Sequence, residues 1–228
     1  KKYDSYDMYK DLYNNPTRKI DELRKYISNK VCQVNCRKGV YNWKIPYADM
    51  QPSEYVGRGS GFVINVLDRK LIVTNHHVVA DFKSIQVMFP FTGLKMYDAH
   101  VVLWCPESDI VFLELKDTTL EIEGLKLAEK GENSDLSSKD LLYAVGFPLG
   151  YQNMHINVGE KTGEHFTNNG GGESLIQHSA QLNEGNSGGA LLTFDKEPVV
   201  VGVNNAIIKG YLGIDFAIPV QRIKILIH

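Results

Sequence analysis

One stretch combines a nucleophile with the backbone freedom that nucleophilic catalysis requires. Residues 183–191 read Asn-Glu-Gly-Asn-Ser-Gly-Gly-Ala-Leu and place Ser187 between glycines, directly before an apolar run. A serine hydroxyl is a weak nucleophile unless a base takes its proton and nearby donors stabilise the oxyanion that forms. Glycines permit the sharp turn that exposes such a hydroxyl, and they let the N–H groups of Gly185 and Ser187 point at one spot. The same residues also suit a plain turn between strands, so catalysis needs a base and an acid elsewhere.

Candidates for the base and the acid lie upstream. Residues 71–79, Leu-Ile-Val-Thr-Asn-His-His-Val-Val, form a β-rich run that ends in two histidines, and Asp109 leads an apolar strand. The chain order His, Asp, Ser is one of three orders in which this triad occurs on unrelated folds. Glu107 is the rival acid, but it precedes the apolar strand, so we expect it to face solvent. Because neighbouring side chains of an extended segment point to opposite faces, we expect only one of His76 and His77 to face the catalytic site.

Six motifs together resemble the trypsin-like serine proteases, and within them the HtrA/Deg family. They occur in the family's order and cover roughly residues 30 to 222. The resemblance implies an all-β fold of two packed six-stranded antiparallel β-barrels, with catalysis in the cleft between them. The matching motifs are Gly59-Ser-Gly-Phe-Val-Ile64, Thr74-Asn-His-His-Val-Val79, Ser108-Asp-Ile-Val111, Val145-Gly-Phe-Pro-Leu-Gly150, Gly185-Asn-Ser-Gly-Gly189 and Phe216-Ala-Ile-Pro219.

The resemblance assigns roles to these residues. The family pattern Thr-Asn-x-His-Val-Val identifies His77 as the base and leaves His76 as a hydrogen-bonded bystander. Asp109 would orient His77, and Ser187 would attack the substrate carbonyl. The oxyanion hole would come from the segment Gly185, Asn186 and Ser187, with the N–H groups of the first and last as donors. Asn186 is uncharged where trypsin has an aspartate that pairs with a newly cut N-terminus, so we expect activity without such a cut.

The substrate pocket departs from the family pattern. The Asp-Ala-Ala that usually lies upstream of the serine motif is replaced by a stretch that ends in Gln181, six residues before Ser187. In trypsin-like enzymes that spacing marks the base of the primary specificity pocket. Because Gln181 is neutral, we expect no preference for Lys or Arg and a medium-sized apolar or neutral residue instead. The remaining pocket residues are expected to be Asn205, Ala206, Ile207 and Ile214.

The resulting prediction is a serine endopeptidase that acts on protein or peptide substrates, including unfolded chains. General quality control and limited processing of a few sites both fit the composition. A catalytically idle protease-fold binding module is the alternative, although the intact triad and glycines argue against it. No cofactor is implied, and the scattered histidines form no metal motif. No PDZ domain follows Pro219, so the resemblance is to the protease domain alone.

Composition limits the partners that we expect. The chain has 228 residues, a formal net charge of −2 and 43% hydrophobic residues, which is ordinary for a globular protein. This charge does not favour binding to nucleic acid or to a membrane surface. No apolar run approaches the ~18 residues that a membrane span needs. We therefore expect neither nucleic acid nor membrane among its partners.

The three cysteines indicate free thiols. Cys32 and Cys36 lie four residues apart on one expected strand, which places their Cα atoms about 13 Å apart, too far for a disulfide. Cys105 could reach one of them, but an odd number leaves at least one thiol free. We expect buried free thiols and a reducing compartment, such as cytoplasm, nucleus or organelle matrix.

Residues 1–29 are expected to form an N-terminal helical arm. Tyr3, Tyr6, Tyr9 and Tyr13 recur at helical spacing, and a second helix begins near Thr17. The tyrosines either pack on the protein's own body or form an oligomer contact. HtrA family members commonly trimerise through aromatic residues near the start of the protease domain, so a homotrimer through this tyrosine stripe is the second interpretation.

The rest of the chain is expected to divide into two β-barrels. Residues 30–128 hold His77 and Asp109, residues 129–140 are a polar linker, and residues 141–228 hold Ser187 and a C-terminal helix. Short alternating runs separated by turn residues predict six strands in each half. Residues 168–173, Asn-Asn-Gly-Gly-Gly-Glu, are expected to be a hairpin tip or a substrate-entry loop.

Overall fold

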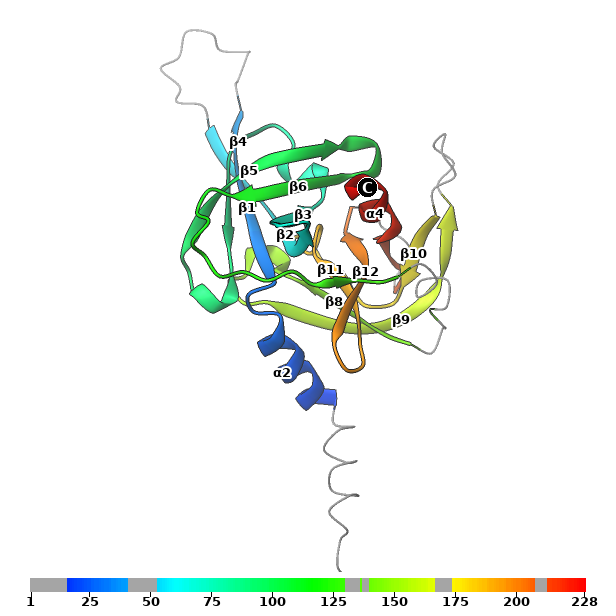
Figure 1. The fold of residues 1–228 in the computed structure, drawn as a ribbon. Helices are drawn as coiled ribbons and strands as arrows, with labels where there is room; N and C mark the ends of the chain where they lie inside the picture. Colours follow the sequence, from blue (N-terminus) through cyan, green and yellow to red (C-terminus); the bar gives the residue numbers. More distant parts are fainter. Residues whose placement is uncertain (1–15, 41–52, 130–135, 137–139, 167–173, 208–212) are drawn as a thin grey trace, which may run out of the picture.

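A computed structural model of the chain describes residues 16–40, 53–129, 136, 140–166, 174–207 and 213–228. Figure 1 shows a first barrel, coloured blue to green, beside a second one, coloured yellow to red. The tyrosine stripe of residues 3–13 and the loop at 168–173 lie outside the described residues. No helix in these ranges is long and apolar enough to cross a membrane.

The first barrel closes with the strand order β1-β2-β3-β6-β5-β4. Inward-facing residues recur at every second position, as in Cys32, Val34 and Cys36 of β1, which are fully buried. Full closure removes the exposed edges that an open sheet would present. The strands are β1 (Val31–Val40), β2 (Ser53–Val66), β3 (Arg69–Thr74), β4 (Phe82–Met88), β5 (Met96–Cys105) and β6 (Ile110–Leu115).

The second barrel has the order β11-β8-β9-β10-β13-β12 and closes through the pairing of β11 with β12. The expected fold of two six-stranded antiparallel barrels is therefore confirmed. A short extra strand, β7 (Lys126–Leu127), pairs in parallel with β12, although its residues fall in the expected first half. The other strands are β8 (Leu141–Gly146), β9 (His155–Phe166), β10 (Ser174–His178), β11 (Ala190–Phe194), β12 (Pro198–Asn205) and β13 (Asp215–Pro219).

A shared hydrophobic core joins the two barrels. Phe62 and Phe112 of the first barrel belong to the same buried cluster as Phe147 and Leu191 of the second. All four side chains are at most 1% exposed. Burying a side chain of this size stabilises the fold by about 2 kcal/mol. The two halves, and the catalytic residues that each carries, are therefore held in a fixed relation.

Two helices flank the barrels in the described part of the chain. Helix α2 (Pro16–Tyr26) begins where the sequence predicts, and Leu23 and the following Ile27 are fully buried against the body. Arg24 donates a hydrogen bond to the carbonyl oxygen of Met154, which ties α2 to the second half. Helix α4 (Gln221–Ile227) ends the chain and buries Ile223 (Figure 1).

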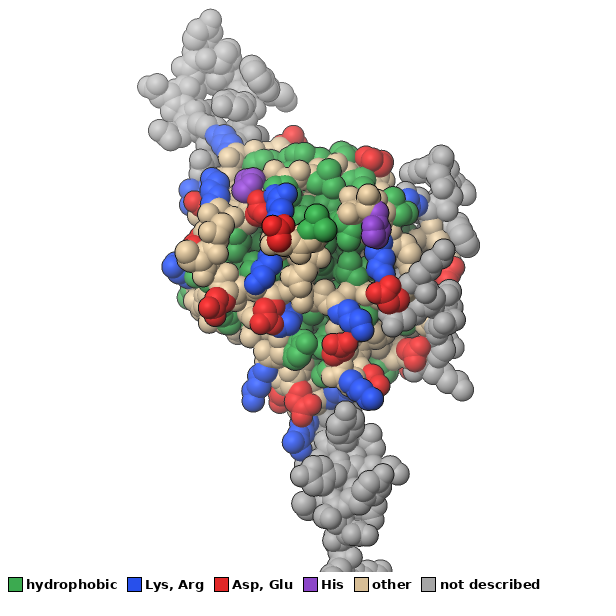
Figure 2. Space-filling view, in the orientation of Figure 1, with side chains coloured by type: hydrophobic (Ala, Val, Ile, Leu, Met, Phe, Trp, Pro, Cys, Tyr) green, Lys and Arg blue, Asp and Glu red, His purple; other side chains and the backbone are tan. Residues whose placement is uncertain are grey.

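Charged side chains of both signs are interspersed over the face that Figure 2 shows. Acidic and basic residues alternate there with green apolar atoms, and no region of that face is covered by one sign. The distribution agrees with the small formal net charge of −2.

Candidate active site

Asp109 is held at the start of β6 by a tight turn. The short 3-10 helix Pro106–Ser108 ends at Asp109, whose φ of 52° and ψ of 39° lie in the left-handed region. A non-glycine residue in this region costs about 1–2 kcal/mol. Its carbonyl oxygen compensates by accepting hydrogen bonds from Asn75 Nδ2 at 3.0 Å and from the N–H of His76 at 3.1 Å. The carboxylate is thereby aimed at His77.

His77 is bound to Asp109 through two groups. Its backbone N–H donates to Oδ1 of Asp109 at 2.9 Å, and its ring Nδ1 lies 2.6 Å from Oδ2. Because an ionised carboxylate can only accept, Nδ1 is the donor in this contact, and in the neutral ring Nε2 is the acceptor nitrogen. This is the tautomer that general-base catalysis on a serine hydroxyl requires.

The two histidines lie on a helical turn, which corrects the expectation of an extended segment. After β3 ends at Thr74, Asn75 leads into the four-residue helix α3 (His76–Val79). The turn still separates the two rings, because that of His76 contacts the Trp104 ring edge-on, with centroids 5.4 Å apart. His76 is therefore a ring-packed neighbour outside the cleft lining, whereas His77 lines the cleft.

Ser187 follows a turn that needs glycines on both sides. Gly185 has a φ of +96° and Gly188 a φ of +85°, which L side chains rarely adopt. A Cβ on Gly188 would lie 2.3 Å from both Ser60 O and Thr74 Oγ1. The carbonyl of Ser187 also accepts a hydrogen bond from the N–H of Ser60 at 2.9 Å. The nucleophile's turn is thus packed directly onto the first barrel.

The peptide before Gly185 has its carbonyl turned away from the expected oxyanion site. Glu184 O accepts a hydrogen bond from the N–H of Leu149 at 2.6 Å, and Gly185 O accepts one from Ser60 Oγ at 2.7 Å. In a trans peptide the N–H points opposite to the carbonyl, so the Gly185 N–H points away from Leu149. Within the described ranges, neither the Gly185 N–H nor the Ser187 N–H donates a hydrogen bond.

Asn186 lies between these two donors but uses its own N–H elsewhere. The Asn186 N–H donates to Asn183 O at 3.0 Å. Its side chain is buried, and Oδ1 has no hydrogen-bond partner among the residues with described positions. Of this three-residue segment, the N–H groups of Gly185 and Ser187 therefore remain available to an oxyanion, and the N–H of Asn186 does not.

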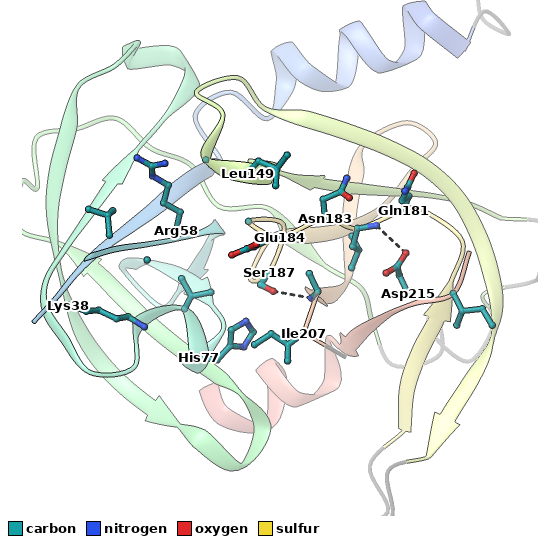
Figure 3. A pocket seen from close by; sticks show the side chains of 18 of the residues that line it. Lys38, Arg58, His77, Leu149, Gln181, Asn183, Glu184, Ser187, Ile207 and Asp215 are labelled. Atoms are coloured by element: carbon teal, nitrogen blue, oxygen red, sulfur yellow. Dashed lines mark hydrogen bonds between the residues drawn. The ribbon is translucent and has the colours of Figure 1, made fainter. Parts of the chain in front are cut away.

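The hydroxyl of Ser187 engages the second barrel rather than the imidazole. Ser187 Oγ accepts a hydrogen bond from the N–H of Ala206 at 3.0 Å (Figure 3). No hydrogen bond joins Ser187 to His77 in the described part of the chain. The His77–Asp109 pair is therefore formed, whereas the third link of the triad is not. Catalytic hydrogen bonds of unliganded enzymes are often long or misaligned and tighten when substrate binds.

A cleft of about 870 Å³ runs between the barrels at Ser187 (Figure 3). Of the expected pocket residues, Gln181, Ala206, Ile207 and Ile214 line it, whereas Asn205 does not. Asn205 instead donates from Nδ2 to Asp109 Oδ2 at 3.0 Å. The first barrel contributes Lys38, Val56, Gly57, Arg58, His77 and Val78 to the lining, and the second contributes Leu149, Gly150, Gln181–Gly185, Ser187, Ala206, Ile207 and Gly213–Asp215.

Three functional positions were not predicted from sequence. Ser60 links the barrels, because its Oγ donates to Gly185 O and accepts from the N–H of Phe147 at 2.9 Å. Asn75 holds the backbone of Asp109, and Asp215 places a carboxylate in the cleft. Ser60 and Asn75 do fall inside the matched motifs, so their motif positions were the available signal. Asp215 directly follows the predicted pocket residue Ile214.

Burial shifts the pKa of two groups near the cleft. Desolvation raises the pKa of the half-buried Asp215 carboxyl, and the hydrogen bond from the Leu182 N–H, at 3.1 Å, acts in the opposite direction. Desolvation lowers the pKa of the buried His178 to about 4. No cluster of three or more His, Cys, Asp or Glu side chains within the described ranges could hold a metal ion.

The chain is similar in sequence to known serine proteases. A family model described as a trypsin-like peptidase domain matches residues 59–203. A serine protease do-like protein of Buchnera aphidicola is 33% identical over 183 residues, which cover 78% of this chain and 36% of that protein. A DegP-like periplasmic serine endoprotease of Chlamydia muridarum is 35% identical over 166 residues, which cover 71% of this chain and 31% of that protein. The periplasmic serine endoprotease DegP of Escherichia coli is 32% identical over 178 residues, which cover 76% of this chain and 36% of that protein.

These comparisons confirm the HtrA/Deg resemblance but contradict the expected compartment. The chain spans about a third of the length of the curated relatives it matches. Two of these relatives are named periplasmic, so the expectation of a reducing compartment is wrong. The cysteines are free and buried, and burial raises the pKa of Cys36 to about 12 and that of Cys32 further. Because the thiolate is the reactive form, buried thiols survive without a reducing environment.

Proposed function

Because the chain belongs to the trypsin-like serine peptidases of the HtrA/Deg type, we propose that it is an endopeptidase that hydrolyses peptide bonds in protein substrates. The observation that supports this most directly is the 2.6 Å contact between His77 Nδ1 and Asp109 Oδ2, at the cleft that Ser187 also lines. The two unused N–H groups at Gly185 and Ser187 supply the complementary oxyanion site.

The first chemical step is acylation. Ser187 Oγ attacks the substrate carbonyl carbon while Nε2 of His77 takes the hydroxyl proton. The carbonyl oxygen becomes an oxyanion that the N–H groups of Gly185 and Ser187 stabilise, and one such donor contributes about 3–4 kcal/mol in comparable enzymes. His77 then gives the proton to the leaving amine, the C–N bond breaks, and an acyl-enzyme remains.

The second step is hydrolysis of that ester. A water molecule gives a proton to His77 and attacks the acyl carbon, and the same oxyanion site holds the new intermediate. The proton returns to Ser187 Oγ as the carboxylic acid leaves. Asp109 remains ionised throughout and stabilises the imidazolium each time it forms.

The Ala206 contact adds one step before this chemistry. Ser187 Oγ accepts from the Ala206 N–H at 3.0 Å, and it must move so that its own O–H donates to Nε2 of His77. A rotation about the serine χ1 angle between staggered wells is enough for such a movement. Substrate backbone that binds the Ala206 N–H would release the hydroxyl, so substrate binding would complete the triad.

Digestion of an unfolded protein tests this function. We expect the wild-type chain to cleave reduced casein or a comparable unfolded protein, and we expect Ser187→Ala and His77→Ala to lose at least about 10⁴-fold in rate. Retained thermal unfolding in the variants is the control for folding. Casein turnover by Ser187→Ala at the wild-type rate would refute the proposal, and binding without any cleavage by wild type would favour the idle binding module.

The distribution of cuts separates two biological roles. Mass spectrometry of the products would show many cuts across an unfolded protein if the role is quality control. A few fixed cuts that also occur in folded substrates would indicate limited processing. We propose the first role, because the related proteins are named DegP or DegP-like endoproteases.

We further infer self-association through the N-terminal arm and an extracytoplasmic location. The helical spacing of Tyr6, Tyr9 and Tyr13 favours a shared aromatic contact between copies. Light scattering should give a trimer mass for the whole chain and a monomer mass when residues 1–16 are removed. An unchanged mass would eliminate the contact. The periplasmic names of the relatives support the location, which cell fractionation tests directly.

A further inference from the structure

The wall of the cleft on the Gln181 side of Ser187 carries a carboxylate. Strand β13 begins at Asp215, which Ile214 separates from the turn at Gly213, whose φ is +86°. Asp215 lines the cleft together with Gln181 and Ile207. In Figure 3 its carboxylate lies on the same side of Ser187 as Gln181, at the end of the dashed line to the Leu182 backbone.

Only part of the hydrogen-bonding capacity of this carboxylate is used. Oδ2 accepts from the Leu182 N–H at 3.1 Å. Among the described residues, Asp215 forms no ion pair and Oδ1 has no hydrogen bond. An ionised carboxylate offers about four acceptor sites, so several remain for a ligand. Burial already raises the pKa of Asp215, which shows that the surrounding protein solvates the charge incompletely.

The charges around the cleft favour a cation at this end. Lys38 and Arg58 lie across Ser187 from Asp215, on the first barrel (Figure 3). The guanidinium of Arg58 disfavours a cationic side chain on that side, whereas the Asp215 carboxylate can pair with one on the other. Glu184 also lines the cleft, but it is exposed, so water screens its charge. A partly desolvated carboxylate attracts a cation more strongly than an exposed one.

We propose that Asp215 is a specificity-determining residue that selects lysine or arginine at the substrate position whose carbonyl Ser187 attacks. This inference rests on the proposed endopeptidase function and replaces the expectation of a neutral preference. That expectation was drawn from the neutrality of Gln181 at the pocket base. The residue that supplies charge lies instead on β13, which pairs with β10 through His178 and Asp215.

The strength of the effect follows from the type of contact. An ammonium or guanidinium group that reaches Asp215 forms a charge-assisted hydrogen bond, which contributes roughly tenfold to hundredfold in binding. Arginine can bind a carboxylate through two parallel hydrogen bonds, so it is the stronger substrate if the geometry permits both. A neutral side chain of similar length, such as methionine or glutamine, leaves the carboxylate unpaired.

Matched fluorogenic peptides that differ only at this position test the proposal. The set holds Lys, Arg, Met and Gln, and kcat/KM is measured for wild type, Asp215→Asn and Asp195→Asn. Asparagine keeps an acceptor for the Leu182 N–H, and Asp195 is an exposed carboxylate of the β11–β12 turn that does not line the cleft. Wild type and Asp195→Asn should prefer Lys and Arg by at least about tenfold, and Asp215→Asn should lose most of that ratio.

A second measurement does not depend on turnover. Benzamidine, an aromatic cation, is titrated by calorimetry into Ser187→Ala and into the same protein with Asp215→Asn. Ser187→Ala should bind benzamidine, and the protein that also carries Asp215→Asn should bind it at least about tenfold more weakly. Equal binding by the two proteins, or equal Lys-to-Met ratios in wild type and Asp215→Asn, would overturn the role of Asp215. Failure of wild type to cleave any peptide, with benzamidine binding intact, would refute the endopeptidase function alone.

Discussion

Asn205 donates a hydrogen bond from Nδ2 to Oδ2 of Asp109 at 3.0 Å, and this bond crosses from the second barrel to the first. The same carboxylate oxygen lies 2.6 Å from Nδ1 of His77. The acid that orients the base is therefore itself oriented by a strand of the other barrel. The packing between the barrels sets the geometry of the catalytic pair, as well as the width of the cleft.

Removal of the Asn205 amide should weaken the catalytic pair. We expect Asn205→Ala to lower kcat/KM by roughly tenfold to hundredfold, because a hydrogen bond to a charged group contributes about 1.5–3 kcal/mol. Peptide hydrolysis at saturating and limiting substrate measures the loss. Asn35→Ala is the matched control, since Asn35 bonds Gln33 at 3.0 Å and does not line the cleft. Equal rates for the two variants would show that Asn205 does not position Asp109.

Ser60 should support the oxyanion site without touching substrate. Its hydroxyl joins Gly185 O, at 2.7 Å, to the Phe147 N–H, at 2.9 Å. We expect Ser60→Ala to lower kcat about tenfold with little change in KM, and to lower the free energy of unfolding by about 1–3 kcal/mol, because two buried backbone groups lose their partner. Ser28→Ala, which removes only a bond to Lys25 O, is the control. A fall in stability with an unchanged kcat would limit Ser60 to a structural role.

Gly188 should tolerate no side chain. An alanine Cβ there would lie 2.3 Å from Ser60 O, at a φ of +85°. We expect Gly188→Ala to lower the free energy of unfolding by more than about 3 kcal/mol, because neither the backbone at residue 188 nor the backbone at Ser60 can move easily. Gly93→Ala shares the positive φ, +69°, but its Cβ would meet open space, so we expect a cost of about 1 kcal/mol. Urea unfolding compares the two, and equal costs would contradict the close packing of the serine turn.

The buried His178 should make the fold sensitive to acid. Burial lowers its pKa from 6.5 to about 4 in the folded chain, so between these values the unfolded state binds more protons. The contribution of neutral His178 to the free energy of unfolding is therefore fully present above pH 6.5. It is lost as the pH falls toward 4, and the loss approaches about 3 kcal/mol. Urea unfolding from pH 7 to pH 4 measures the decline.

The matched variants for this acid sensitivity are His178→Gln and His155→Gln. His178→Gln should show a flatter dependence on pH, whatever its absolute stability. His155 is exposed, stacked on Tyr151 with ring centroids 5.7 Å apart, and its variant should follow wild type. An identical pH slope for wild type and His178→Gln would contradict the role of His178.

The barrels and the acid–base pair could be predicted from sequence because they follow from local patterns. Alternating apolar residues specify the strands, and the motifs around His77 and Asp109 supply the residue types that the chemistry needs. The helical turn at His76–Val79 was missed because β-branched and apolar residues on both sides of the histidines favour a strand, although Asn75 is a residue type that commonly precedes a helix. Strand β7 was missed because two residues are too few to show a period.

The contacts that cross between the barrels could not be predicted. Ser60 and Asn205 are separated by many residues from their partners in the other barrel, and only the packing of closed barrels brings them together. Asp215 meets Leu182 within the second half, again over a long separation in sequence. The pocket was assigned from the spacing of Gln181 to Ser187, which says nothing about strand β13. The compartment was inferred from free thiols, although burial alone is enough to protect them.

The most direct test of the central claim is covalent labelling of Ser187. A fluorophosphonate probe reacts with a serine hydroxyl only where a base and an oxyanion site act on it, so it reports the assembled machinery. The probe should modify one site in the wild-type chain, which peptide mapping locates at Ser187. His77→Ala should label far more slowly and Ser187→Ala not at all. Absence of labelling in folded wild type, or equal labelling of Ser187→Ala, would contradict this account.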